Sequence, residues 1–360
     1  MLFAYTYVNH SIEQFQEYLE HLVKEVWCKR TEQFSVDMLD PALREIVLDL
    51  YNIEEDTARG KVKDWLFGPI RDIYNLCKAL DATQRQQIAD WFDNNNDIAA
   101  LCANDPTKPP ATYANVDVIS PALAGAMKEF FGSLFTSVIG LTPVTRRIGE
   151  IDNHYDAFVA VNTKGKCPYC GLNDLKGPHQ SKRDPYDHFL PKGTYPFNSV
   201  NFRNLAPMCV ECNSSYKSVK DPTRGIDPIS RDNGRIRRKA FYSYAAVAAT
   251  IEITVKLRTK DVLHLQPNQI DLTFASPTHE EEVEAWKDVF GIEERYKAKL
   301  CSESDGKAWF QRITEEGTDS GLSMDQALQY ELRAAKRVIE HDAGFLKIPF
   351  LNACREARII

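Results

Sequence analysis

The chain has 360 residues, of which 43% are hydrophobic and 26% charged, and its formal net charge at pH 7 is −7. A chain of this length and composition can form two or three compact units, and no segment approaches the continuous apolar length of a membrane span. The first residues lack the basic flank of a secretory signal. We therefore expect a soluble, cytoplasmic protein that uses no membrane, and the negative net charge excludes a nonspecific coat for nucleic acid.

Helical periodicity dominates the first 150 residues. Apolar residues recur at spacings of three and four from residue 11 to residue 26, and Ser11 and Gln14 are placed as a capping box at the start of this helix. The proline-rich segment 105–110 interrupts the later helices. We predict a helical N-terminal domain over residues 1–150. Its further helices are expected near residues 41–53, 61–80, 82–103 and 116–140.

Two Cys-X-X-Cys pairs lie in the middle of the chain, at Cys167 and Cys170 and at Cys209 and Cys212. Each pair places two thiols at the separation that one tetrahedral zinc ion accepts, so together they predict a closed, structural zinc site. A redox pair or two disulfides are the alternatives, but a reducing cytosol favours metal binding. Core packing is expected for the five isolated cysteines, which are Cys28, Cys77, Cys102, Cys301 and Cys354.

The 38 residues between the two pairs carry an acid beside a histidine, Asp187-His188, and Asn213 directly follows the last cysteine. A carboxylate and an amide oxygen suit Mg²⁺ or Mn²⁺ and leave coordination positions for phosphate and water. The unperturbed pKa of a histidine lies near neutrality, so we expect His188 to be available as a general base at about pH 7. Adjacent residues converge on one site only where a strand ends or bends, which Pro191 supports. His179 lacks a spaced partner and is predicted to be an ordinary loop residue.

The order of these residues over roughly 164–220 resembles the HNH endonucleases, specifically the zinc-containing ββα-metal type. The resemblance implies a two-stranded hairpin followed by a helix, with His188 as the base, Asn204 fixing the connecting loop, and Asp187 and Asn213 as metal ligands. Asn213 stands where the family's name has its last histidine, as in the His-Asn-Asn variants. An amide favours Mg²⁺ or Mn²⁺ over Ni²⁺ or Zn²⁺.

The C-terminal pattern is loosely similar to bacterial HNH proteins found with anti-phage defence systems, including those paired with an ATPase. This likeness implies an effector role in such a system, with an ATPase or another regulatory defence protein as a partner. The chain itself carries no phosphate-cradling Gly-X-X-X-X-Gly-Lys-Ser/Thr loop. Any nucleotide-driven switching is therefore expected to come from the partner.

Basic residues concentrate around the motif. Residues 164–240 contain 15 Lys and Arg against 7 Asp and Glu, a net charge of +8, so the remainder of the chain carries −15. Such clustering is typical of binding to phosphate backbones and predicts DNA as the partner. The basic run at 235–239 is either a further contact or a solvated surface. The residues expected to contact phosphates are Lys192, Arg203, Lys217 and Lys220.

After the motif, β-branched and aromatic residues predict strands, and helical periodicity then returns. The strands are expected within 241–257 and 262–274, and the helices at 280–300 and 324–341.

We therefore predict an α+β protein in which mostly helical flanks surround a central ββα-metal (HNH) nuclease module. The module is placed at residues 151–225 and a C-terminal α+β region at 226–360. The predicted activity is hydrolysis of DNA phosphodiesters with Mg²⁺ or Mn²⁺. Two alternatives stay open: a ribonuclease or transfer-RNA-cleaving toxin on the same site, and a non-catalytic, zinc-dependent module that binds nucleic acid.

Overall fold

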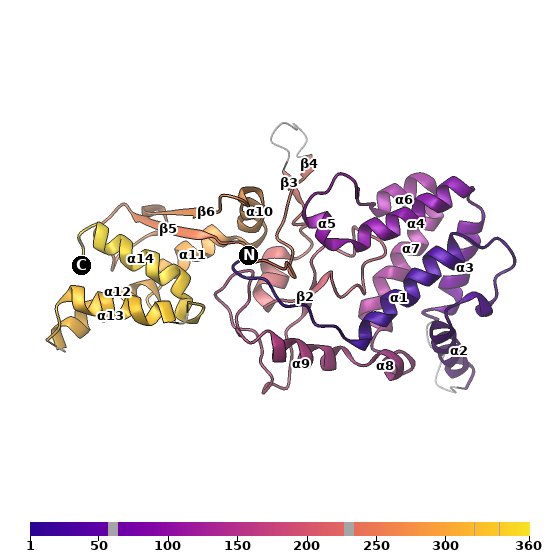
Figure 1. Cartoon of the computed structure of the whole chain (residues 1–360), viewed down its shortest axis with the longest axis horizontal. Coiled ribbons are helices and arrows are strands. Elements are labelled where there is room, and N and C mark those ends of the chain that lie inside the picture. The colour runs from indigo at the N-terminus through magenta and orange to yellow at the C-terminus, as the bar shows by residue number, and fades with distance from the viewer. Residues whose placement is uncertain (57–63, 227–233, 320, 338) are drawn as a thin grey trace.

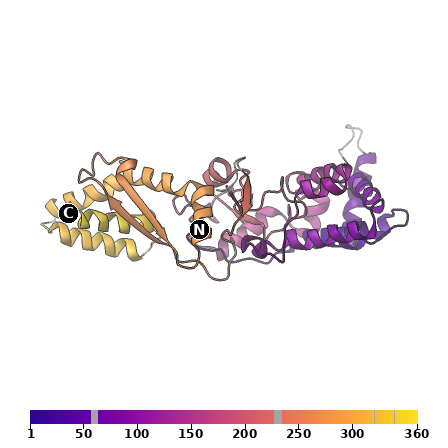
Figure 2. The same cartoon turned by 90° about the horizontal axis from the view of Figure 1, so that it is seen from above.

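The structure is a computed structural model of the whole chain, and it describes residues 1–56, 64–226, 234–319, 321–337 and 339–360. The molecule is elongated, with a helical N-terminal part at one end and a C-terminal part at the other (Figures 1 and 2). A small central part lies between them, and the first residues of the chain run across it. The amide of Leu2 donates to the carbonyl of Pro168, and the amide of Tyr5 donates to the carbonyl of Ser243.

The N-terminal part is built from short helices that bury one apolar stripe each. The first helical run carries Ile12, Phe15 and Leu19, all without exposed surface, on one face. Its elements are η1 (Ser11–Glu13), α1 (Gln14–His21), η2 (Leu22–Trp27), η3 (Val36–Met38), α2 (Pro41–Asp56), α3 (Phe67–Lys78), α4 (Ala82–Asn96), α5 (Ile98–Cys102), α6 (Tyr113–Ile119), α7 (Pro121–Ser133), η4 (Leu134–Val138), α8 (Thr142–Ile148) and α9 (Ile151–Val161).

The predicted capping box of the first helix is wrong. The imidazole of His10 accepts a hydrogen bond from the amide of Ile12, and the carboxylate of Glu13 accepts one from the amide of His10. Ser11 lies one residue inside the helical run, and its hydroxyl donates to the carbonyl of Ile148. The cap therefore forms one residue earlier than the Ser-X-X-Gln pattern indicates, because an imidazole nitrogen can accept this bond as an oxygen does.

Two of the long predicted helices are broken. The helix predicted at 82–103 is divided at Asp97, whose carboxylate caps α5 by accepting from the amide of Ala100. The helix predicted at 116–140 is divided at Ser120, which caps α7 ahead of Pro121. Proline is favoured at the first position of a helix and cannot continue one, so this division follows from the sequence. Of the helix predicted at 61–80, residues 61–63 lie outside the described part of the chain.

The central part contains two short antiparallel hairpins and one helix. Strand β1 (Tyr186–His188) pairs with β2 (Leu205–Pro207), with Asp187 opposite Ala206, and the helix η5 (Glu211–Lys217) follows β2 directly. A second hairpin joins β3 (Arg224–Ile226) to β4 (Arg235–Arg237). Asp187 and His188 lie on β1 and Asn213 lies in η5, so the order strand, strand, helix positions these three residues.

The C-terminal part pairs one hairpin with five helices. Strands β5 (Glu252–Leu257) and β6 (Ile270–Ala275) are shorter than predicted, and α14 packs against β5. At Gly291, φ is +58°, and an added Cβ would lie 2.5 Å from the ring of Tyr216, so only glycine fits between α10 and α11. The remaining elements are η6 (Pro267–Gln269), α10 (Glu280–Phe290), α11 (Ile292–Cys301), α12 (Gly306–Asp319), α13 (Met324–Arg337), η7 (His341–Ala343) and α14 (Gly344–Glu356).

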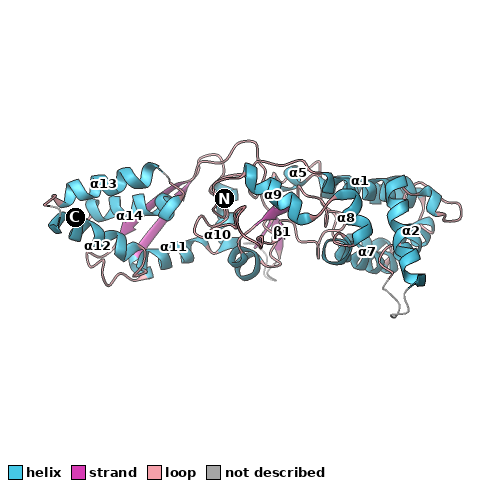
Figure 3. Cartoon of the chain, turned by 90° about the horizontal axis from the view of Figure 1, so that it is seen from below, coloured by secondary structure: helices cyan, strands magenta, loops and turns pink. Residues whose placement is uncertain are grey.

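Helices predominate over strands, as Figure 3 shows. In the described ranges the strands form three small sheets of two strands each. The prediction of a mostly helical α+β protein is confirmed at this level. Four of the five isolated cysteines are buried, and Cys301 is half-buried. None of the helices described here has the length and apolar character needed to cross a membrane.

Candidate functional site

The four cysteines of the two Cys-X-X-Cys pairs come together as predicted. Their sulfur atoms all lie within 4.8 Å of one another, and all four residues are buried. A zinc ion with Zn–S bonds of about 2.3 Å places its four sulfurs about 3.8 Å apart, so the cluster can hold one zinc ion. Cys167 and Cys170 come from the loop before β1. Cys209 and Cys212 come from the turn into η5, so the cluster joins the start of the hairpin region to the helix that follows it.

Polar groups surround the cysteine cluster on the side of the C-terminal part. Arg295, on α11, donates to the sulfur of Cys212 at 3.2 Å and to the carboxylate of Glu211 at 2.9 Å. Asn173 donates to the same carboxylate and lies 3.5 Å from the sulfur of Cys209. Four thiolates around Zn²⁺ leave two negative charges, and the buried guanidinium offsets part of that charge. Sequence spacing gave no indication of Arg295.

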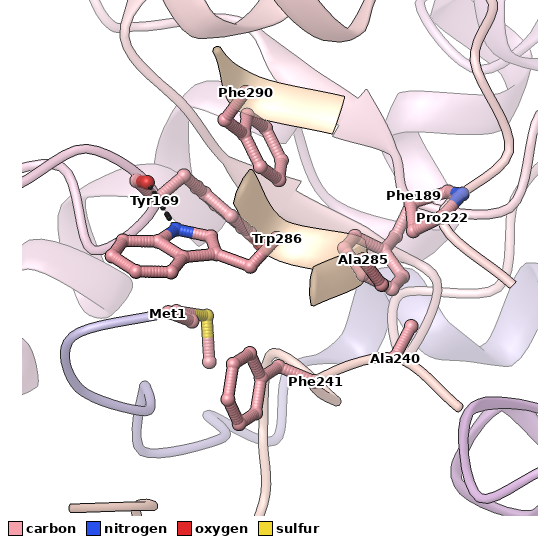
Figure 4. A pocket seen from close by; sticks show the side chains of 9 residues that line it. All are labelled: Met1, Tyr169, Phe189, Pro222, Ala240, Phe241, Ala285, Trp286 and Phe290. Carbon is pink, nitrogen blue, oxygen red and sulfur yellow. Dashed lines mark hydrogen bonds between the residues drawn. The ribbon is translucent and has the colours of Figure 1, made fainter. Parts of the chain in front are cut away.

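Aromatic side chains pack against the segment between Cys167 and Cys170, on the same side of the cysteine cluster. The indole of Trp286 donates to the carbonyl of Tyr169 at 2.6 Å, and the ring of Phe290 stacks on Tyr169 with centroids 5.0 Å apart (Figure 4). Met1 and Phe241 complete the small apolar pocket in this view. Both Trp286 and Phe290 belong to α10, so this helix packs directly on the backbone between Cys167 and Cys170.

Asn204 ties together the loop that joins β1 to β2. Its side chain is fully buried; Oδ1 accepts from the amide of Leu190 at 2.8 Å, and Nδ2 donates to the carbonyl of Leu190 at 3.0 Å. Nδ2 also lies 3.4 Å from the carbonyl of Asn198. These bonds hold both ends of the loop at a fixed separation, as expected of a residue that fixes the loop.

His188 ends β1 and is held by the same loop. Its Nε2 lies 2.8 Å from the carbonyl oxygen of Ser199, and the ring of Phe135 meets the imidazole edge to face at 4.8 Å between centroids. A carbonyl oxygen only accepts, so Nε2 carries the proton and Nδ1 holds a free lone pair. Burial lowers the pKa of His188 to about 3, which keeps the ring neutral at pH 7.

Asp187 and Lys217 form a buried ion pair beside His188. The ammonium of Lys217 lies 3.1 Å from Oδ1 and 3.0 Å from Oδ2 of Asp187, and it donates to the carbonyl of His188 at 2.9 Å. Oδ2 accepts no well-directed hydrogen bond. Burial raises the pKa of Asp187, and the nearby ammonium opposes that shift. The expected contact of Lys217 with phosphate is therefore not what the structure presents, because only 1% of the side chain is exposed.

A cleft of about 550 Å³ opens over these residues. Asp187, His188 and Asn213 line it, and among the described residues the side-chain amide of Asn213 has no hydrogen-bond partner. A single helical face of α7 and η4 also lines the cleft. That face consists of Lys128, Gly132, Phe135 and Thr136.

The predicted phosphate contacts divide into three groups. Lys192 lines the cleft, where burial lowers its pKa and its ammonium donates to the carbonyl of Gly132. Arg203 and Lys220 are exposed outside the cleft lining; Arg203 stacks on Tyr7 at 4.2 Å, and Lys220 reaches the carbonyl of Val289. Lys217, as described, is buried. The exposed histidine of the preceding loop, His179, does not line the cleft.

Lys128 is the cleft residue that the sequence left unnoticed. It is exposed, it lines the cleft, and no carboxylate described in the structure lies within ion-pair distance of its ammonium. Helical periodicity puts Lys128, Gly132 and Phe135 on one face. The sequence does not indicate that this face meets His188.

No family model matches the chain, and no solved structure matches it. The chain is similar to the Septu protein PtuB of Bacillus thuringiensis, with 34% identity over 113 residues. The matched segment is 30% of this chain and 39% of PtuB, well under half of either protein. This chain is therefore similar to a Septu protein over part of its length.

Proposed function

We propose that this protein is an HNH-type endonuclease that hydrolyses phosphodiester bonds of DNA with Mg²⁺ or Mn²⁺. The observation that carries the proposal is the hydrogen bond between His188 and the carbonyl of Ser199, because His188 lines the same cleft as Asp187 and Asn213. A histidine held in this way can take a proton, and a carboxylate and an amide beside it can hold a hard cation. The order of strand, strand and helix around the cysteine cluster agrees with this proposal.

His188 is the general base in the proposed reaction. With its proton on Nε2, the imidazole can accept a further proton only at Nδ1. The hydrogen bond to Ser199 therefore determines which ring nitrogen is the base. Asn204 supports this arrangement because it fastens the loop that carries Ser199. Phe135 packs against the ring and limits its rotation.

Asp187 and Asn213 are the proposed ligands of the catalytic cation. One carboxylate oxygen and one neutral amide oxygen are hard donors, and Oδ2 of Asp187 and the Asn213 amide both have coordination capacity that the described residues leave unused. When bound, the cation stabilises charge on the phosphate and on the departing oxygen. The zinc site supports Asn213 from the adjacent position, because Cys212 fixes the start of η5.

Lys128 and Lys192 are proposed to receive the phosphate backbone. Both line the cleft, Lys128 from α7 and Lys192 from the loop after β1, and the ammonium of Lys192 reaches the carbonyl of Gly132 on α7. Lysines in such positions give affinity without sequence choice. The similarity to the Septu protein PtuB supports a role in anti-phage defence, and we infer that a partner such as an ATPase controls the activity.

Cleavage of supercoiled plasmid by the purified protein tests the proposal. We expect nicked or linear product with Mg²⁺, none with EDTA, and none from His188→Ala. His179→Ala is the matched control, because His179 is an exposed loop histidine outside the cleft, and it should cut like the wild type. The assay is repeated in cells challenged with phage together with the neighbouring genes, so that a missing activator does not hide the activity.

Two outcomes favour the alternatives. Preferential cleavage of structured RNA over duplex DNA, still dependent on His188, points to a ribonuclease, since only RNA presents a 2′-hydroxyl. Equal binding of nucleic acid by wild type and His188→Ala, with no cleavage in the purified system or in cells, points to a non-catalytic binding module.

A further inference from the structure

Lys217 occupies an unusual position for a lysine. Its side chain is 1% exposed, and its ammonium contacts both carboxylate oxygens of Asp187 and the carbonyl of His188. A lysine buried without an anionic partner would lose its charge or destabilise the fold, so the ion pair explains the burial. The contact links the end of η5 to the end of β1.

Lys217 is the last residue of η5. Helix η5 ends at Lys217 because Ser218 adopts φ +46° and ψ −117°, a conformation that residues other than glycine rarely adopt. The amide of Ser218 still donates to the carbonyl of Asn213 at 2.9 Å. Asn213 and Lys217 both belong to η5, so the same short helix supplies an amide to the cleft lining and an ammonium to Asp187.

The cleft has little negative charge of its own. Of the described residues that line it, Asp187 is the only acid, whereas Lys128 and Lys192 are both basic. The buried ammonium of Lys217, which does not line the cleft, neutralises the carboxylate charge of Asp187. Asn213 contributes no charge, and His188 is held with a single ring proton. A divalent cation that enters without substrate therefore meets a surface with no net negative charge.

We propose that Lys217 keeps the protein side of the catalytic metal position electrically neutral, so that a divalent cation binds tightly only together with a phosphodiester. The proposal rests on the assignment of Asp187 and Asn213 as metal ligands under the proposed nuclease function. The affinity of oxygen sites for hard cations rises with the number of charged ligands, and this site has one carboxylate, already paired. The phosphodiester supplies the missing negative charge. Free protein then holds little catalytic cation, and cation and nucleic acid bind cooperatively.

Mn²⁺ binding to the zinc-loaded, full-length protein tests this proposal without relying on cleavage. Free Mn²⁺ is measured by electron paramagnetic resonance with and without duplex DNA, in a His188→Ala background that prevents hydrolysis. We expect DNA to lower the Kd for Mn²⁺ by at least about tenfold, and Lys217→Met to lower it by a similar factor without DNA. Lys217→Arg keeps the charge and should behave like the His188→Ala parent. Asp187→Asn should abolish the binding, which identifies the site.

Three results would overturn the role of Lys217. They are an unchanged Mn²⁺ Kd in folded, zinc-containing Lys217→Met, no tightening of Mn²⁺ by DNA in the parent protein, and no Mn²⁺ binding by any variant. The second result applies even if Lys217→Met does not fold. Mg²⁺-dependent plasmid cleavage without this coupling would refute the role of Lys217 and leave the nuclease standing. Coupling without cleavage, in the purified system and in cells, would refute the nuclease and keep the neutral metal site.

Discussion

Replacing Asn204 by alanine removes the side chain that fastens the β1–β2 loop. The change leaves the amide and the carbonyl of Leu190 without this partner in a buried region, whereas the carbonyl of Asn198 keeps the bond from the amide of Asn201. The two lost hydrogen bonds cost about 1 kcal/mol each and the orphaned buried amide about 1–3 kcal/mol, so we expect roughly 3–5 kcal/mol of local destabilisation. At about 1.4 kcal/mol per factor of ten, the loop should open about a hundred to a few thousand times more often.

Hydrogen exchange read by mass spectrometry measures this opening. Peptides covering residues 189–204 should lose protection by about that factor in Asn204→Ala, because local opening governs exchange. The cysteine cluster lies outside the loop, so the variant should keep its zinc. Asn268→Ala is the matched control, an exposed asparagine in η6 for which little change is expected. Equal protection of the loop in both variants would refute the role assigned to Asn204.

Three further predictions concern the zinc, the cleft and a buried histidine. Removing zinc with a chelator should abolish cleavage by displacing Asn213, and adding Mg²⁺ alone should not restore it; full activity in zinc-free protein would contradict this. Lys128→Ala should weaken DNA binding and reduce the slope of log K against log[salt] by about one, whereas the exposed Lys256→Ala on β5 should change neither. Burial lowers the pKa of His154, which bonds to the hydroxyl of Tyr186, to about 4. The folded state therefore binds fewer protons than the unfolded state between about pH 6.5 and 4, and stability should fall by up to about 3 kcal/mol across that window as the pH drops. Unfolding of His154→Gln at several pH values should show a shallower dependence, and an equal dependence would refute this source.

Sequence reasoning succeeded where local spacing determines geometry. Two Cys-X-X-Cys pairs confine four thiols to one point, so the cysteine cluster could be predicted without any long-range information. The end of β1 at His188 followed from an acid and a histidine close to Pro191. Asn204 lies buried in the loop and bonds to Leu190 and Asn198, whereas the role in a nuclease that the resemblance to HNH enzymes implied stays a prediction.

Long-range contacts were beyond the sequence. Periodicity shows that Lys128 and Phe135 share a helical face but not that this face lies over His188. Lys217 was expected to meet phosphate because it follows the motif by one turn, whereas its ammonium forms a buried ion pair with Asp187. A single sequence cannot reveal such pairings, since they depend on how separate elements pack.

The strand predicted from residue 241 is too long because the aromatic residues near its start do not belong to a strand. Tyr244 donates to the carbonyl of Leu205, and the hydroxyl of Tyr169 bonds to that of Ser243. This segment lies against the central part without forming a strand, and its Ser243 carbonyl accepts a hydrogen bond from the amide of Tyr5. Aromatic content raises strand propensity, but the same rings serve equally well to anchor an irregular segment.

The guanidinium of Arg295 makes the cysteine cluster dependent on a helix about 80 residues further along the chain. An excised fragment covering 151–225 would contain every motif residue yet lack the cation beside Cys212 and the indole that holds Tyr169. Its cysteine cluster with zinc bound would keep an excess of negative charge. The segment between Cys167 and Cys170 would lose the apolar side chains that pack against it. The segment with the two Cys-X-X-Cys pairs is thus not portable: a graft into another protein, or a truncated version of this one, has to carry α10 and α11 with it.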